Sequence, residues 1–378
     1  MAIYFDNAAT SPLDSEVLAT MLPFLETHHG NPSSVHQLGR KTRAAIERVR
    51  KAIAQSINAS TGEIFFTSGG TESTNAIFCG AVRDLGVKHI ITSPLEHHCV
   101  LHTVEHLCHT HQIHAHYAGL LPNGHIDLED LRSQLQSLNE PTLVSLMHGN
   151  NEIGNLLDLE KVADICAENN AFFHSDTVQT FGFHRFDVQK TKFSFMTGSA
   201  HKFYGPKGIG FLYINGDNNI KPNMFGGAQE RNMRAGTENL YGIVGLGKAV
   251  EIAYRDFDTV HEHIKTLKQH FITAIKALIP DVSFNGDAEG ASLDKVINVS
   301  FPKRLSGDLL LMNLDIAGIC ASGGSACSSG SVVGSHVLNA MGVASDVSNV
   351  RFSFSKYNTI EEIEECMRQL AKILKINS

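Results

Sequence analysis

Several features are missing from this sequence, and each absence argues against a class of protein. The chain has no dense run of basic residues and a formal net charge of −8, which argues against a nucleic-acid-binding protein. No apolar stretch approaches the length that spans a membrane. The first residues show neither the basic segment nor the apolar core of a signal peptide. These absences favour a soluble globular protein.

The seven cysteines are odd in number and show no disulfide spacing. This pattern predicts a reducing compartment, which we expect to be the cytoplasm. Hydrophobic residues make up 42% of the chain and charged residues 19%, which is enough for a large buried core. Since 378 residues are many for one domain, we expect a two-domain enzyme.

Helical and strand patterns alternate through the first two-thirds of the chain. Short apolar runs at 64–66, 89–92, 143–147 and 171–173 are typical of buried parallel strands, and amphipathic helical segments lie between them. The alternation predicts a large α/β domain over residues 15–255, in which helices flank a mostly parallel sheet.

The pattern changes near residue 255, where no sharp linker marks the boundary. We expect residues 1–14 and 256–378 to form a smaller α+β domain. A run of small residues within about 322–335 interrupts this domain and is expected to be a mobile loop. Helices are predicted at 258–278 and 359–375, and strands at 295–301 and 350–355.

Lys202 and Asp176 each come at the end of an apolar segment. A pyridoxal phosphate (PLP) enzyme needs a lysine whose amine forms a Schiff base with the cofactor aldehyde. It also needs a carboxylate that faces the pyridinium nitrogen and keeps it protonated. Either residue alone is more simply explained as a surface lysine in a turn or an aspartate at a strand end. Together they indicate a PLP site.

The segment 67–75 reads Thr-Ser-Gly-Gly-Thr-Glu-Ser-Thr-Asn, follows a predicted strand and opens a helix. Free backbone N–H groups and hydroxyls at a helix N-terminus suit a phosphate monoester. An ordinary helix cap with a glycine turn is the simpler explanation of this segment taken alone. It is not a Walker motif, because no Lys-Ser/Thr pair follows the glycines.

Three further residues suggest chemistry, each with a simpler alternative. His97 follows a strand end and faces the usual ligand crevice, where it could lie on a cofactor ring, or it merely starts the next helix. Arg351, in a predicted strand, suits a substrate carboxylate or is an edge-strand arginine that points to solvent. Cys327, in the loop of small residues, is either a mobile nucleophile or an inert thiol.

The segment 97–116 is rich in histidine, and His98, His102 and His106 fall on one helical face. A metal site is one interpretation of such a row. No carboxylate or cysteine is spaced to complete a tetrahedral ligand set, so a solvated polar face is the favoured interpretation.

The sequence resembles one family nearly from end to end: the cysteine desulfurases of the NifS and IscS type, within the class-V aminotransferases of the fold-type I PLP enzymes. The fold class implied is a large α/β domain with a mostly parallel sheet, plus a smaller α+β domain. The matching segments are 4–10, 30–34, 67–73, 150–154, 199–202, 234–237, 325–327 and 351–353.

The resemblance implies a cofactor role for each matching residue. Lys202 would carry PLP and move the α-proton of the substrate, Asp176 would pair with the pyridine nitrogen, and Gln179 would bond the ring hydroxyl. His97 would stack on the ring. A threonine of the neighbouring subunit, matched by Thr237, would reach the phosphate, which implies a homodimer. Within the subunit the phosphate would be held by Gly70, Thr71, Ser199 and His201.

The substrate implied is L-cysteine, whose carboxylate Asn151 and Arg351 would grip. Cys327 would attack the substrate sulfur, leaving a persulfide and alanine. The sulfur would pass to an acceptor protein, for iron–sulfur cluster assembly or tRNA thiolation. Two departures from the family bear on partner choice: relatives often carry Glu-Pro after the serines that follow Cys327, and some extend beyond the position of Ser378.

Other functions remain open on the sequence alone. A selenocysteine lyase or another class-V PLP aminotransferase would share the fold and the cofactor residues. Formation of alanine together with sulfide, and the presence of Cys327, separate a desulfurase from these enzymes. A histidine-rich metal-binding protein without catalysis is the alternative from a different class.

Overall fold

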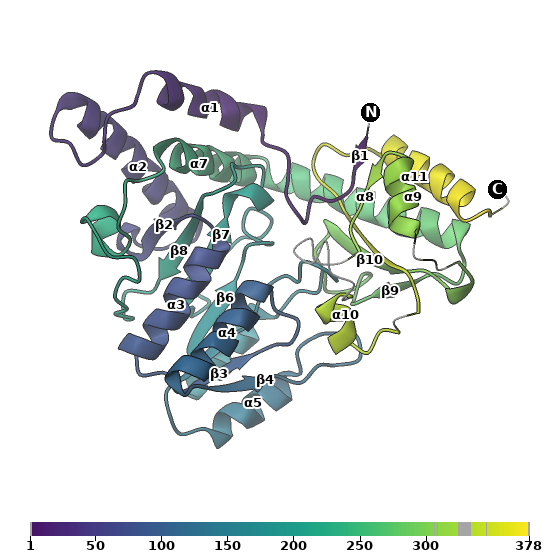
Figure 1. The fold of residues 1–378 in the computed structure, drawn as a ribbon, viewed down its shortest axis with the longest axis horizontal. Coiled ribbons are helices and arrows are strands. Elements are labelled where there is room, and N and C mark those ends of the chain that lie inside the picture. Colours follow the sequence, from purple (N-terminus) through teal and green to yellow (C-terminus); the bar gives the residue numbers. More distant parts are fainter. Residues whose placement is uncertain (1, 306, 308, 324–333, 345, 377–378) are drawn as a thin grey trace.

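A seven-stranded sheet lies at the centre of the larger part of the molecule (Figure 1). The computed structural model describes residues 2–305, 307, 309–323, 334–344 and 346–376. Within these ranges, no helix combines the length and the apolar character needed to cross a membrane. The strands of the sheet are β2 (Ile64–Thr67), β3 (His89–Thr92), β4 (His114–Tyr117), β5 (Thr142–Ser145), β6 (Phe172–Asp176), β7 (Phe195–Ser199) and β8 (Gly210–Ile214).

The strand order is β2-β8-β7-β6-β5-β3-β4, and only β8 runs against the others. The mostly parallel sheet predicted from the sequence is therefore confirmed. The expectation that the run 64–66 pairs in parallel is wrong, because β2 lies at the edge of the sheet and pairs antiparallel with β8. Periodicity could not show this, since an apolar run of four residues has the same pattern in either pairing.

Helices cover both faces of this sheet, because successive side chains of each strand point to opposite faces. In β2, Ile64 and Phe66 enter one apolar core and Phe65 enters the other. The helices α3 (Gly70–Asp84) and α4 (His98–His111) pack on the face of Phe65 and lie in front of the sheet in Figure 1. The opposite face is covered by α1 (Ser15–Glu26), α2 (Gln37–Ser56), α5 (Leu128–Ser137), α6 (Leu159–Glu168) and α7 (Leu240–Arg255).

A second sheet, antiparallel and in the order β12-β10-β9, lies beside the first with its own apolar core (Figure 1). A short parallel pair of β1 and β11 adjoins it, so the start of the chain packs against a segment more than 300 residues away. The elements of this part are β1 (Ile3–Tyr4), α8 (Phe257–Leu278), β9 (Ser283–Asn285), β10 (Val296–Ser300), α9 (Leu310–Ile316), β11 (Ile319–Cys320), α10 (His336–Ala340), β12 (Asn349–Ser353) and α11 (Ile360–Ile373).

The helices and strands predicted for the C-terminal part are present, and α8, α11, β10 and β12 lie within a few residues of their predicted limits. The domain limits at residues 14/15 and 255/256 stay a prediction. The core of the predicted mobile loop, residues 324–333 with Cys327, lies outside the described residues.

The outer edge of β2 is satisfied by two buried charged side chains. Arg50 of α2 and Glu230 form a bidentate pair with two N–O distances of 2.8 Å, and they are 1% and 3% exposed. Arg50 also donates to the carbonyl of Ile64 at 2.7 Å, and Glu230 accepts from the amide of Phe66 at 2.7 Å. The pair thus bonds backbone groups that an edge strand leaves unpaired.

We expect Arg50→Met to lower the free energy of unfolding by about 3–5 kcal/mol, because it leaves the Glu230 carboxylate buried without its partner. Urea unfolding followed by circular dichroism measures this change. The control is Lys51→Met at the exposed neighbouring position on α2, where a change within about 0.5 kcal/mol is expected. Equal effects of the two substitutions would contradict the structural role of the pair.

Candidate active site

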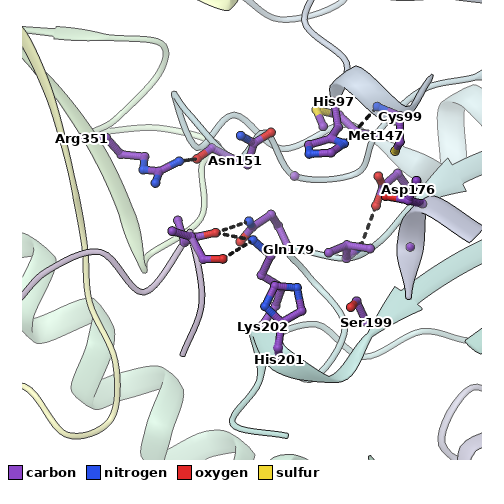
Figure 2. A pocket seen from close by; sticks show the side chains of 16 residues that line it. His97, Cys99, Met147, Asn151, Asp176, Gln179, Ser199, His201, Lys202 and Arg351 are labelled. Atoms are coloured by element: carbon purple, nitrogen blue, oxygen red, sulfur yellow. Dashed lines mark hydrogen bonds between the residues drawn. The ribbon is translucent and has the colours of Figure 1, made fainter. Parts of the chain in front are cut away.

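A cavity of about 270 Å³ lies where the carboxyl ends of the parallel strands face the smaller sheet (Figure 2). Asp176 and Arg351 stand at opposite ends of the cavity, with Gln179 and Lys202 between them (Figure 2). Its lining brings together nearly all of the residues singled out in the sequence: Gly70, Thr71, His97, Asn151, Asp176, Gln179, Ser199, His201, Lys202 and Arg351.

Asp176 is the last residue of β6, in the middle of the sheet. One carboxylate oxygen accepts the amide hydrogen of Val178 at 2.9 Å, and the side chain is only 6% exposed. Burial raises the pKa of this carboxyl group above its usual range. A cationic group in the cavity would offset the cost of burying the carboxylate, so the site is suited to a protonated ring nitrogen.

The sequence predicted that Lys202 ends a strand, but β7 ends at Ser199, and Lys202 comes three residues later, in a short 3-10 helix (Ala200–Lys202). Its amine donates to the carbonyl oxygens of Ala8 and Ala9 at 2.6 and 2.8 Å. The amine lines the cavity beside a segment from the start of the chain. These bonds to the N-terminal segment help to set where the amine lies.

His97 is the N-cap of α4, which confirms that it starts the helix, and it also lines the cavity. Its Nδ1 accepts the amide hydrogen of Cys99 at 3.1 Å, which places the proton of the neutral ring on Nε2. Burial, followed by the nearby charge of Lys202, lowers the pKa of His97 to about 4. The ring is therefore neutral at physiological pH.

The first turn of α3 forms a concave backbone site, as the segment 67–75 predicted. The helix begins at Gly70 after Gly69, whose φ of 151° favours glycine. Glu72 binds the amide of Ser68 at 2.8 Å, while the amides of Gly70 and Thr71 lie at the helix start, where no intrahelical acceptor exists. Gly70 and Thr71 line the cavity, and amides at a helix start suit an anionic oxygen.

Ser199 and His201 border the same end of the cavity. Ser199 is the last residue of β7 and is 4% exposed. The Nδ1 atom of His201 lies 3.1 Å from the hydroxyl oxygen of Thr10. Burial, followed by the charge of Lys202, lowers the pKa of His201 to about 4, so a neutral imidazole borders the anion site.

Arg351 lies in β12 and is 1% exposed, so the alternative of an arginine that points to solvent is wrong. One terminal nitrogen donates to Asp6 at 2.7 Å and the other to the backbone oxygen of Asn151 at 2.8 Å. The buried Nε has no hydrogen-bond acceptor among the described residues. A guanidinium held in this way can still donate to a carboxylate that enters the cavity.

Gln179 lies deep in the cavity and is 4% exposed. Its amide nitrogen donates to the carbonyl of Ala8 at 2.9 Å. The amide oxygen is buried and has no donor among the described residues. It can accept a hydrogen bond from a ligand hydroxyl, which is the role that the resemblance implied.

Two of the predicted site residues are not among the lining residues. Thr237 is exposed, and its segment is held to α3 by Arg234, whose Nε donates to Glu72 at 2.8 Å. Cys327 lies outside the described residues, so its role rests on the sequence.

Several lining residues escaped the sequence argument: Ala8, Ala9, Cys99, Met147, Gly149 and Val178. Two of them carried a usable signal, because Cys99 and Val178 each lie two residues after a predicted site residue. Burial raises the pKa of the Cys99 thiol to about 12, so this group is a poor nucleophile at neutral pH.

The histidines of α4 form a surface feature beside the cavity. His102 and His106 are exposed, and the ring of His98 lies between those of His102 and His336, at centroid distances of 5.1 and 4.4 Å. Across the part of the chain that is described, no three His, Cys, Asp or Glu side chains are grouped so that they could hold a metal ion.

Comparison with known proteins identifies the class of protein that this fold and cavity define. The aminotransferase class-V family model matches residues 3–366. A relative from Bacillus subtilis, described as putative cysteine desulfurase IscS 1, is 42% identical over 99% of this chain and 98% of its own length. The chain therefore belongs to the class-V aminotransferase family.

Solved structures show which group within this family the chain resembles. A NifS-like protein superposes with a TM-score of 0.91 at 35% identity, with both chains fully covered. The structure titled "SspA in complex with cysteine" has a TM-score of 0.81 at 32% identity, covering 94% of this chain and 100% of that one. Within the family the chain groups with the cysteine desulfurases of the IscS and NifS type, and it is a PLP-dependent enzyme.

The cavity fits this cofactor on its own evidence. A buried carboxylate at one end, helix-start amides beside Ser199, and an unpaired amide oxygen at Gln179 match a ring nitrogen, a phosphate and a ring hydroxyl. The volume of about 270 Å³ is close to the lower end of the range of small-molecule sites, about 300–1,000 Å³.

The low pKa of His201 predicts an acid-dependent loss of stability. The unfolded chain binds a proton on this histidine near pH 6.5, whereas the folded protein resists protonation down to about pH 4. The free energy of unfolding therefore decreases as the pH is lowered from about 6.5 to about 4. The substitution His201→Gln should make this decrease smaller by up to about 3 kcal/mol. Urea unfolding at a series of pH values measures it, with exposed His106→Gln as the control; parallel curves for wild type and His201→Gln would contradict the assignment.

Proposed function

We propose that the protein is a cysteine desulfurase that removes sulfur from L-cysteine, forms L-alanine and passes the sulfur through Cys327 to an acceptor protein. The observation that carries this proposal is the arrangement of Lys202, Asp176 and Arg351 in one cavity. A basic amine, a buried carboxylate and a guanidinium with a free donor are the groups that amino acid chemistry on PLP requires.

Arg351 would bind the carboxylate of the substrate. Its two terminal nitrogens are held by Asp6 and by the backbone of Asn151, which prevents the guanidinium from rotating. The Nε atom, which has no acceptor among the described residues, and the second hydrogen of each terminal nitrogen can still donate to the substrate. A substrate carboxylate bound there lies at the opposite end of the cavity from Asp176, so the Cα–H bond is placed between the two, near Lys202 (Figure 2).

Lys202 would take the proton from the substrate Cα and return it. Bound PLP supplies an electron-withdrawing ring that stabilises the negative charge left on Cα. Asp176 would keep the ring nitrogen protonated, and neutral His97 would border the ring without adding a competing positive charge. The carbonyls of Ala8 and Ala9 orient the amine of Lys202 within the cavity.

Cys327 would take the sulfur atom. Its thiolate forms a bond to the sulfur of the substrate while the Cβ–S bond breaks, and the electron pair of that bond stays with the carbon skeleton, which is protonated and leaves as alanine. The cysteines of the described part do not offer a better nucleophile, because Cys99 alone lines the cavity and burial raises the pKa of its thiol. The sequence resemblance supports Cys327 in this role.

We expect the Cys327→Ala variant to keep the absorbance of bound PLP. Its rates of alanine and sulfide formation should be lower by roughly a hundredfold or more, because the nucleophile is removed. The assay supplies L-cysteine and a reductant, and measures alanine and sulfide together. Wild type should form equal amounts of both, and Cys108→Ala, on α4, serves as the matched cysteine control.

Three outcomes would contradict parts of this proposal. Conversion of L-cysteine to 3-mercaptopyruvate, with amination of an added keto acid, would indicate an aminotransferase, and turnover of selenocysteine alone would indicate a selenocysteine lyase. Loss of activity in Cys99→Ala with full activity in Cys327→Ala would place the nucleophile in the cavity wall.

We also propose a homodimer in which Thr237 of one subunit completes the phosphate site of the other. Thr237 is exposed in the single chain and does not line its own cavity, yet Arg234 and Glu72 fix its segment beside the turn that precedes α3. The sulfur acceptor is proposed to be a protein, either an iron–sulfur scaffold or a sulfur carrier.

Mixing two inactive variants tests whether Thr237 acts across subunits. In a mixed dimer of Lys202→Ala and Thr237→Ala, one site has both its own Lys202 and an intact Thr237 from the partner chain. Activity at limiting PLP should therefore recover in part after subunit exchange. The control mixture combines Lys202→Ala with Gln179→Ala. Gln179 and Lys202 line the cavity of the same chain, so neither site of this mixed dimer is complete and no recovery is expected. Equal recovery in the two mixtures would contradict the proposed dimer site.

A further inference from the structure

A second cavity, of about 290 Å³, lies apart from the candidate active site, between the end of the larger sheet and α8. Exposed His184, His261 and Ala291 surround its mouth, and buried Leu293 and Lys295 lie inside. None of its lining residues takes part in the proposed desulfurase reaction.

Lys295 is the unusual residue of this cavity. It directly precedes β10 and is 3% exposed, and its buried amine has no hydrogen-bond partner among the described residues. Lys268, which is also buried nearby, shows the usual arrangement, because its amine donates to Ser292 at 2.7 Å and to the carbonyl of Leu293 at 3.0 Å. A buried lysine without such partners is costly to the fold.

Among the described residues, no carboxylate forms an ion pair with the amine of Lys295. The adjacent Asp294 pairs with His261 at 3.2 Å, and the amine lies over the ring of Phe183, 4.0 Å from the ring centroid. Burial, followed by the charge of nearby Lys202, lowers the pKa of Lys295 well below its ordinary value. A lowered pKa raises the fraction of the amine that is uncharged and carries a free electron pair at neutral pH.

We propose that Lys295 is a reactive amine at which small aldehydes that enter the second cavity form an imine. The nitrogen electron pair adds to the carbonyl carbon, and a proton moves from nitrogen to oxygen. Loss of water then gives the imine, so the atoms balance without an oxidant or a reductant. Uncharged lysines in apolar pockets or beside another cation are the ones that react in this way.

The cavity wall selects the class of carbonyl compound. Leu156, Ile264 and Leu293 line the cavity with apolar surface, and Phe183 covers the amine. An uncharged aldehyde with a short alkyl chain fits such a wall. An anionic compound would meet no arginine and no lysine other than Lys295 among the lining residues, and burial disfavours the charged form of that amine. Phe183 is half-buried, and rotation of its ring would open the path to the amine.

Reductive trapping tests the proposal on the wild-type holoenzyme. The protein is incubated at pH 7 with butanal and cyanoborohydride, and labelled lysines are mapped by peptide mass spectrometry. Lys276 is an internal comparison, because its amine also lies over a phenylalanine ring, that of Phe284 at 5.5 Å, but is exposed and paired with Glu289. An exposed lysine is uncharged in only roughly 1 of 2,500 molecules at this pH.

We expect Lys295 to be labelled at least tenfold faster than Lys276, and Phe183→Ala to increase that ratio. Labelling of Lys295 no faster than that of Lys276, or only after unfolding in urea, would overturn the proposal. Lys295→Met should remove the label while Lys276→Met leaves the labelling of Lys295 unchanged. The result does not depend on the desulfurase reaction, since label at Lys202 is scored on a separate peptide.

Discussion

The common direction of the strands beside β6 is the constraint on which the candidate site depends. Parallel strands bring their carboxyl ends to one edge of the sheet, so the segments that follow β3, β5, β6 and β7 meet there although they are far apart in the chain. His97, Met147, Asp176 and Lys202 line the cavity for this reason. The antiparallel strand β8 lies between β7 and β2 and lets β2 keep the same direction, which brings α3 and its free amides to the same edge.

The start of the chain joins this edge to the smaller sheet. Ala8 bonds the side chain of Ser353 through its amide, and its carbonyl accepts from both Lys202 and Gln179. One short segment therefore orients the amine of Lys202 and ties it to the strand that carries Arg351. Charges of opposite sign occupy opposite ends of the cavity, while the imidazoles between them stay neutral because they are buried. A zwitterionic amino acid suits this distribution of charge.

Lys202 and Lys295 show how the groups around a lysine amine determine its hydrogen bonding. Lys202 has carbonyl acceptors and lies near Asp176. Lys295 has an aromatic ring and no acceptor among the described residues. A lysine amine is thus held by hydrogen bonds in the first cavity and is without them in the second. PLP carries a phosphate, which suits the amides at the start of α3 in the first cavity, whereas a small alkyl aldehyde needs no anion site.

The sequence alone was sufficient for the fold class and for the residue types of the site. Burial periodicity is a local property, so the strands, the amphipathic helices and the cofactor pair of Lys202 and Asp176 could be read from short segments. Family resemblance then supplied roles for Gln179 and Asn151, which no local pattern would have indicated. The parallel pairing expected for β2 was wrong, because the partner of a strand is not encoded in its own few residues.

Tertiary structure decided the features that join residues distant in sequence. Three such features depend on residues that are more than 100 positions apart in the chain. They are the hydrogen bonds from Lys202 to the carbonyls of Ala8 and Ala9, the ion pair of Asp6 with Arg351, and the contact of Lys295 with the ring of Phe183. Each is a matter of hydrogen-bond geometry or of charge in a low-dielectric interior, and both quantities depend on distance in space. A sequence therefore specifies which groups are present, whereas folding determines which of them remain without a partner.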